Sequence, residues 1–147
     1  REMIMPASIQ GSGNIGKDIA VKYISVNGKP RSVAEISIFV DAFKTNEKGE
    51  IVSDEKNAYW IRASIWGERA EQSARILKKG QRVFFSGRQK ISTWVDKEGV
   101  QRFNVDVELE SIALGIGRIE SVQMKEKTER TPAVQHSTAE YFDQDAE

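Results

Sequence analysis

Residues 58–67 restrict the fold of this chain more than any other stretch, because their side chains alternate in character at every second position. A period of two is that of a β-strand, whose successive side chains point to opposite faces of a sheet. One face is apolar and suits a protein core; it carries Ile61, Ala63 and Ile65. The opposite face combines large aromatic rings with a cation; it carries Trp60, Arg62, Ser64 and Trp66. Core packing alone does not require this second face.

Two interpretations of the aromatic and cationic face are consistent with this strand. Flat rings stack on the faces of nucleobases, and an adjacent arginine can contact a phosphate. Single-stranded nucleic acid is bound in this way without its sequence being read. Alternatively, the face is buried in a sheet that is covered on both sides, since aromatic side chains supply much of the burial in ordinary cores. The strand by itself favours neither interpretation.

The same arrangement recurs in residues 81–95, where a second such strand is predicted. Its apolar face carries Val83, Phe85 and Ile91. Its other face carries Phe84, Ser86, Arg88, Lys90, Ser92 and Trp94, and Gly87 permits a bend or bulge. Buried cations would need paired partners to offset their desolvation. The recurrence therefore favours an exposed surface for single-stranded nucleic acid, with sheet-edge solvation or an oligomer interface as the alternatives.

The remaining segments predict a mostly β domain with one helix. Further strands are predicted at residues 3–10, 19–26, 32–43 and 100–109. The first of them is expected at a sheet edge, because Pro6 cannot donate to a strand ladder. A turn is predicted at Gly11, Gly13 and Gly16. Polar residues 45–56 predict a flexible loop, and apolar residues at helical spacing predict a helix over 67–79.

Two of these strands have faces that bear on function. The aliphatic face of residues 32–43 carries Ala34, Ile36, Ile38 and Val40. At the end of this strand Phe43 is followed by Lys44, so the pair is another stacking candidate. The apolar face of residues 100–109 carries Phe103, Val105, Val107 and Leu109. Its opposite face is acidic, so this strand is not expected to lie under nucleic acid along its whole length.

Chain length and charge predict one domain and a tail. The 147 residues are divided here into a domain at residues 3–115 and a tail at residues 116–147. Lys and Arg number 22, as do Asp and Glu, but the tail has a net charge of −3 and the rest of the chain +3. A mildly basic body with an acidic end suits a nucleic-acid binder.

No catalytic, metal or cofactor site is predicted. Cys is absent, which excludes disulfides and thiolate metal sites. His136 is the single histidine, so a catalytic triad of the Ser-His-Asp type is not favoured. The carboxylates of Asp106, Glu108 and Glu110 do not alternate with His or Cys, so a metal-dependent nuclease is not favoured. No apolar run approaches the roughly 18 residues of a membrane span, and no signal peptide is recognised. A cytoplasmic protein without membrane contact is expected.

The order of the predicted elements suggests a fold. The predicted fold is an all-β OB-fold barrel, which has five strands and one helix between the third and the fourth, here followed by an irregular acidic tail; the six strands predicted above exceed this order by one. Over about residues 11–114 the sequence also resembles the bacterial single-stranded DNA-binding proteins. The segments that resemble the family's strands and helix are residues 13–18, 21–23, 34–38, 60–71 and 77–87. The hairpin that follows in the family is resembled by four residues of this chain, Trp94, Asp96, Gly99 and Arg102.

The resemblance implies roles for individual residues. Trp60, Trp66 and Trp94 match base-stacking positions; Arg62 and Lys79 match basic contact positions, and Lys22 is a weaker match. Members of the family are commonly homotetramers that serve DNA replication, recombination and repair.

The sequence also departs from the family pattern. Phe43 and Lys44 stand near the place of a family tryptophan, and Glu68 replaces an expected basic residue. The tail lacks the family's long linker and its Pro-Phe tip. These differences suggest a divergent member from a mobile element such as a phage or plasmid. Three interpretations of the acidic tail stay open: it contacts replication or repair proteins, it folds back onto the domain, or it is a flexible, disordered end.

The predicted function is binding and protection of single-stranded DNA, independent of its sequence. The residues predicted to bind DNA are Trp60, Arg62, Trp66, Trp94, Phe43, Lys44, Lys79, Phe84, Arg88, Lys90 and Lys22. The alternative is a protein-interaction accessory factor of the primosome or conjugation type, in which the same aromatic face packs against a protein partner.

Overall fold

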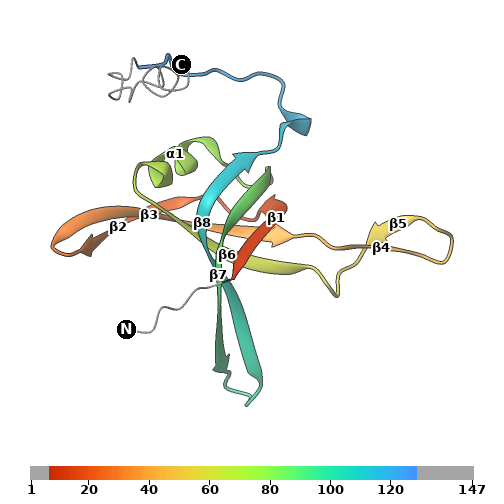
Figure 1. Ribbon diagram of the computed structural model, residues 1–147. Coiled ribbons are helices and arrows are strands. Elements are labelled where there is room, and N and C mark those ends of the chain that lie inside the picture. The colour runs from red at the N-terminus through yellow and green to blue at the C-terminus, as the bar shows by residue number, and fades with distance from the viewer. Residues whose placement is uncertain (1–6, 129–147) are drawn as a thin grey trace, which may run out of the picture.

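The computed structural model describes residues 7–128 (Figure 1). Within this range the chain is mostly β, with one α-helix and a short 3₁₀ turn. The strands are β1 (Ser8–Ile15), β2 (Ala20–Val26), β3 (Lys29–Val40), β4 (Phe43–Thr45), β5 (Ile51–Ser53), β6 (Tyr59–Trp66), β7 (Arg82–Val95) and β8 (Gln101–Leu114). The helices are α1 (Glu68–Ile76), between β6 and β7, and η1 (Ile116–Arg118), after β8.

Strand pairing closes most of the main sheet on itself. The strand order is β1-β7-β8-β6-β3-β2, and β1 also pairs with β3, where Asn14 lies opposite Phe39. The strands β1, β7, β8, β6 and β3 therefore form a ring, and β2 extends it through a hairpin with β3. The β6–β8 pair is parallel. Figure 1 shows the hairpins β2–β3 and β4–β5 and the distal part of β7–β8 extending outward from this ring.

The hydrophobic core lies inside the ring of strands. Ile61, Ala63 and Ile65 on β6 are each no more than 1% exposed, which confirms the inward face predicted from their alternation. Ala70 of α1 and Leu77, which follows the helix, pack against the same cluster. The largest fully buried side chains are Ile15, Ile36, Ile38, Ile61, Ile65, Val83 and Val107. Each such side chain contributes about 1.5–3 kcal/mol through its removal from water.

The predicted turn at Gly11 and Gly13 is wrong, because both residues lie within β1. A Cβ on Gly13 would meet the carbonyl oxygen of Phe39 and, at 2.6 Å, a side-chain methyl of Ile38. A Cβ on Gly11 would come within 3.0 Å of the ring of Phe85. These glycines therefore allow strands to approach closely where the ring closes. The prediction failed because closely spaced glycines are also the usual sequence signal of a turn.

The predicted flexible loop at residues 45–56 is also wrong, because part of it forms the β4–β5 hairpin. The side-chain oxygen of Asn46 accepts hydrogen bonds from the backbone N–H groups of Lys48 and Glu50, each at 2.9 Å. Gly49 provides the positive φ of 80° that the hairpin turn requires. Local side-chain to backbone bonds thus order a segment that has almost no apolar pattern.

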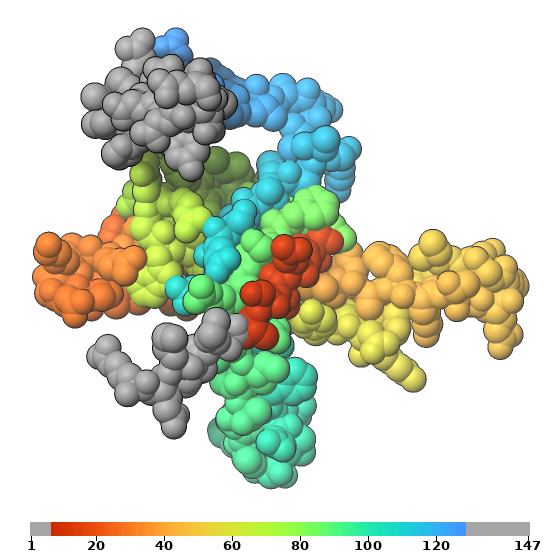
Figure 2. Space-filling view, in the orientation of Figure 1, coloured from red at the N-terminus to blue at the C-terminus, as the bar shows by residue number. Residues whose placement is uncertain are grey.

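The distal part of the β7–β8 hairpin has an apolar face that is not buried. The sequence predicts Ile91 and Phe103 on the core side of their strands, but their exposed fractions are 56% and 65%. The alternation itself is present, because Phe103 lies opposite Thr93 and Ile91 opposite Val105. The hairpin extends beyond the ring there (Figure 2), and within residues 7–128 no further strand pairs beside it or buries this face.

Several element boundaries differ from those predicted. The helix ends at Ile76 rather than residue 79, since Leu77 has an extended backbone with ψ of 133°. Strand β8 continues to Leu114 instead of ending at residue 109. A register shift falls between Ser86 and Gly87, as expected for the bend or bulge at Gly87. The extra residue is Glu110 of β8, which has no opposite partner in the ladder.

Asp54 lies at the bend that leads from β5 towards β6, and only 7% of its surface is exposed. Its Oδ2 accepts a hydrogen bond from Nδ2 of Asn57 at 2.5 Å, and its Oδ1 accepts one from the backbone N–H of Lys56 at 3.3 Å. The bond from Asn57 is the main reason that the pKa of Asp54 lies below its ordinary value of 3.8. The ionised carboxylate is therefore the form that the fold stabilises.

This lowered pKa predicts how stability depends on pH. The ionised carboxylate of Asp54 contributes to the free energy of unfolding. This contribution is complete above the pKa of the unfolded chain, near 3.8, and is lost as the pH falls through the lower pKa of the folded protein. An Asp54→Asn variant should therefore unfold at a lower urea concentration than the parent at pH 7, and this difference should shrink at pH 3. Urea unfolding at pH 7, 5 and 3 measures it, with the exposed neighbour Glu55→Gln as control. An equal difference at all three pH values would contradict the prediction.

Candidate nucleic-acid interface

The outward side chains of five strands form one continuous surface, called here the outer face. Strand register connects it from strand to strand, because Trp60 lies opposite Phe39 and Arg62 lies opposite both Ser37 and Asp106. The outer face comprises Lys22 of β2, Glu35, Ser37 and Phe39 of β3, Trp60, Arg62 and Trp66 of β6, Asp106 and Glu108 of β8, and Arg88, Lys90 and Trp94 of β7. Seven residues predicted to bind DNA are thus brought onto one surface.

Trp60 is held in place on one side and open to solvent on the other. Its ring centroid is 5.1 Å from that of Phe39, and the two planes are tilted by 53°. Its six-membered ring also covers Gly16, where a Cβ would collide with it. In spite of these contacts, 57% of the residue is exposed. An anchored ring with a free face loses little conformational entropy when it stacks on a planar ligand.

Trp66 is partly exposed, and the guanidinium of an arginine lies over its ring. The guanidinium carbon of Arg31 lies 5.3 Å from the ring centroid, which is the geometry of a cation–π contact. Arg31 precedes Val33, the residue of β3 that lies opposite Trp66. The sequence prediction missed Arg31, because the register of β3 against β6 is needed to connect these two residues.

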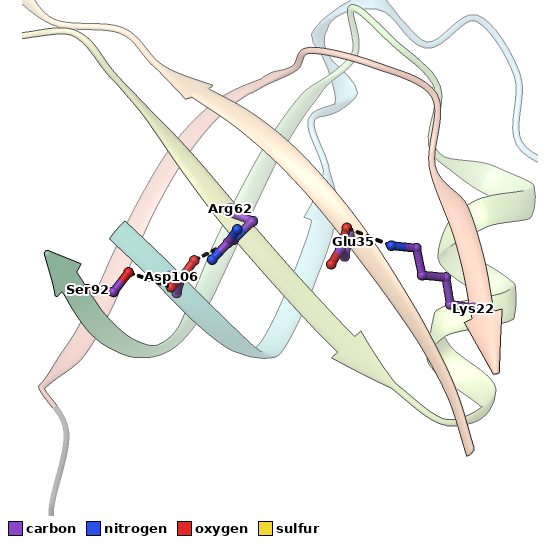
Figure 3. A network of polar contacts seen from close by, with 5 residues as sticks. All are labelled: Lys22, Glu35, Arg62, Ser92 and Asp106. Carbon is purple, nitrogen blue, oxygen red and sulfur yellow. Dashed lines mark hydrogen bonds and ion pairs between the residues drawn. The ribbon is translucent and has the colours of Figure 1, made fainter. Parts of the chain in front are cut away.

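Arg62 forms a short ion pair on the outer face. Its Nε donates to Oδ1 of Asp106 at 2.6 Å, and Oδ2 of Asp106 accepts a longer bond of 3.4 Å from the hydroxyl of Ser92. Figure 3 shows Arg62 and Asp106 pointing toward each other across neighbouring strands. The hydrogen bond from Arg62 to Asp106 raises the pKa of the guanidinium above its ordinary value. Arg62 therefore stays charged, but a carboxylate already neutralises much of its attraction for a phosphate.

Other cations of the outer face also have carboxylate partners. Nε of Arg88 is 3.0 Å from the carboxylate of Glu110, and Nζ of Lys22 is 3.5 Å from that of Glu35. In the ladder, Lys90 lies directly opposite Asp106. Salt bridges of this exposed kind contribute about 0–1 kcal/mol each, so a phosphate can compete for the cations.

Trp94 lies on the distal β7–β8 hairpin, and 44% of it is exposed. It is opposite Arg102, whose Nε donates to Oδ2 of Asp96 at 2.8 Å. This bond is the main reason that the pKa of Asp96 lies below its ordinary value. Because Asp96 also accepts bonds from the N–H groups of Glu98 and Val100, the turn beside Trp94 is fixed.

Four residues predicted to bind DNA lie outside this surface. Phe43 and Lys44 are both exposed on the β4–β5 hairpin, which Figure 2 shows projecting from the body in yellow. Lys79 and Phe84 line a cavity of about 970 Å³ at the end of the ring where the chain leaves β8. Arg82 and Arg118, which the sequence prediction omitted, also line this cavity.

The residues that the structure describes provide two further observations. No cluster of three or more His, Cys, Asp or Glu side chains among them could hold a metal ion. In the same part of the chain, α1 is too short to span a membrane, and no other helix is longer.

A closed, mostly β sheet that exposes tryptophans and cations on one face has the architecture of the proteins that bind single-stranded nucleic acid. The sequence matches the single-strand binding protein family over residues 8–114, which is most of the chain. This chain therefore belongs to the single-strand binding protein family.

A solved structure shares the fold of this chain. It is the crystal structure of a small single-stranded DNA-binding protein from Streptomyces coelicolor, with a TM-score of 0.61 and 18% sequence identity. The match covers 78% of this chain and 99% of that protein. At this identity the similarity concerns the backbone arrangement.

Proposed function

We propose that this protein binds single-stranded DNA, independent of its sequence, by stacking bases on tryptophan rings and contacting phosphates with Arg and Lys. The observation that carries the proposal is Trp60, whose ring is fixed by Phe39 and Gly16 but is still 57% exposed. Trp66 and Trp94 lie on the same outer face. The anchored ring of Trp60, together with two further tryptophans and the cations of the same face, suits a flexible strand whose bases are unpaired.

The biological part of the proposal follows from family membership. The protein protects single-stranded DNA during replication, recombination or repair, and acts as a homotetramer in the cytoplasm without enzymatic activity. We take β1, β3, β6, β7 and β8 as the five strands of an OB-fold barrel, with α1 between the third and the fourth. The acidic residues proposed to contact replication or repair proteins lie mainly at 129–147, outside the described residues.

A fluorescence titration tests the proposed activity. Adding oligo-dT should quench the tryptophan emission, because two of the three tryptophans are well exposed and stacking changes their environment. Binding should weaken as salt rises, because phosphate contacts release counterions. A parallel titration with poly-U determines whether RNA is bound as well. Absence of quenching and of binding at low salt would overturn the proposal.

A second candidate function is a protein-interaction module of the primosome or conjugation type. Two observations favour it: carboxylates pair with Arg62 and Arg88, and the distal hairpin exposes Ile91, Val95 and Phe103. Exposed apolar patches often mark protein contacts. In this case a protein would contact the outer face together with the apolar side of the distal hairpin, which is opposite to Trp94, and single-stranded DNA would bind weakly.

The ion pair of Arg62 leads to a prediction about salt dependence. An Asp106→Asn variant removes the competing carboxylate, so Arg62 becomes free to contact a phosphate. Affinity for oligo-dT should rise about five-fold at low salt, and the slope of log affinity against log salt should steepen by about 0.7. The matched control is Glu120→Gln, which makes the same charge change on an exposed residue after η1. Equal effects of both variants would show that only net charge matters.

A further inference from the structure

We propose that a hollow beside Trp66 binds one nucleotide of the strand and prefers bases with an exocyclic amino group over thymine. The hollow has a volume of about 480 Å³ and is lined by Val26, Arg31, Trp66, Arg69, Glu108 and Leu109. This is within the range of about 300–1,000 Å³ that is usual for small-molecule sites. The inference rests on the proposed function and refines it, because it adds a base preference at one position of a surface whose other contacts are independent of sequence.

The hollow is built from three parts of the fold. The β2–β3 hairpin contributes Val26 and Arg31, β6 and the start of α1 contribute Trp66 and Arg69, and β8 contributes the rest. Figure 1 shows this hairpin extending from the ring below α1. Arg69 is held there, because its Nη1 donates to the backbone carbonyl of Glu110 at 2.5 Å. Its other N–H groups remain for a ligand.

The two arginines of the hollow suit a phosphate. Across residues 7–128, neither Arg31 nor Arg69 forms a salt bridge, which distinguishes them from Arg62 and Arg88. Arg31 is exposed and its guanidinium lies over the face of Trp66 without a carboxylate partner among residues 7–128, so the guanidinium can leave the ring. A base that stacks on Trp66 then takes the place of the guanidinium, which moves to the adjoining phosphate.

Glu108 provides the base preference. It is exposed, lines the hollow, and forms no ion pair with any described cation, although Arg88 lies opposite it in the ladder. An ionised carboxylate only accepts hydrogen bonds, so it favours the amino groups of cytosine, adenine and guanine. In thymine the carbonyl oxygen O4 takes the place of the amino group of cytosine and adenine, so a carboxylate that faces this position repels it.

The test compares oligo-dC with oligo-dT of equal length, because both are flexible pyrimidine strands. The ratio of dC to dT affinity should be at least about five-fold lower in Glu108→Gln than in the parent, since a glutamine can also donate to thymine. Arg31→Ala should weaken binding of both strands equally and reduce the salt slope by about 0.7. Arg75→Ala, at an exposed arginine of α1 that neither lines the hollow nor belongs to the outer face, is the control.

The outcomes separate this inference from the proposed function. If the parent binds both oligonucleotides and Glu108→Gln leaves their affinity ratio unchanged, the base preference is wrong and the DNA-binding function stands. If the parent binds neither strand at low salt, the proposed function itself fails. Because Arg31 and Glu108 are both exposed, the variants should keep the parent's thermal unfolding temperature, which circular dichroism measures.

Discussion

Replacing Trp60 and Trp94 together with alanine is expected to weaken binding of single-stranded DNA by about 30-fold or more. Stacking contributes about 1–3 kcal/mol per base, and the double variant removes two stacking rings, so the loss is about 2–6 kcal/mol. Both rings are on the outer face, and both have exposed area that a base can cover. Loss of one ring alone should give roughly half of the free-energy change, because the two lie on different strands.

The measurement is anisotropy of a labelled oligo-dT, since the double variant lacks most of the intrinsic signal. The matched control is Phe103→Ala, because Phe103 lies on the same hairpin as Trp94 but on its opposite face and is 65% exposed. This control should change the affinity by less than two-fold. Light scattering of the same samples reports assembly. An intact DNA affinity together with a lost assembly would favour the protein-interaction function.

The faces of the strands could be predicted from the sequence because the backbone fixes the period of a strand. The period of two separates Ile61 and Ile65 from Trp60 and Arg62 as two faces of one strand. The recurrence of the same pattern at residues 81–95 then favours the surface for Trp60 and Arg62, because buried cations would need paired partners. The observed exposed fractions agree with this assignment for all four residues. The alternation of two strands and the cost of burying their cations were therefore sufficient to predict the main candidate surface.

The contacts between strands could not be predicted, because they depend on register between distant segments. Arg62 and Asp106 are 44 residues apart, and only the parallel pairing of β6 with β8 brings them within 2.6 Å. The Arg31–Trp66 contact requires the register of β3 in the same way. The charge of the outer face is thus more balanced than a list of its Arg and Lys residues suggests.

Burial on the distal hairpin was mispredicted for another reason. Ile91 and Phe103 have the same alternation as residues that are buried elsewhere, but their part of the hairpin extends beyond the ring. Alternation indicates which face of a strand is apolar, and the path of the chain determines whether anything covers that face. The glycines of β1 are the converse case. They are needed because neighbouring strands approach closely there, but closely spaced glycines in a sequence resemble a turn.

Gly13→Ala is expected to lower the free energy of unfolding by about 1–3 kcal/mol or more, as overpacking does in a tight interior. At Gly13 the strand β1 is opposite Val83 of β7, and the next residue, Asn14, pairs with both β7 and β3. The added methyl would meet the carbonyl group of Phe39, which is backbone and cannot rotate away. Relief requires β1 to move away from β3, which opens the ring of strands.

Thermal unfolding of Gly13→Ala should show a fall in Tm of about 5–15 °C. The control is Gly117→Ala in η1, where a Cβ would have no neighbour within 4 Å and no positive φ opposes the substitution. The control should stay within about 0.5 kcal/mol of the parent. Equal stability of the two variants would mean that β1 accommodates a side chain, and the closure between β1 and β3 would then be looser than its contacts indicate. A large difference would establish that the glycine of the predicted turn is needed for strand closure, because the two variants differ only in what surrounds the new methyl group.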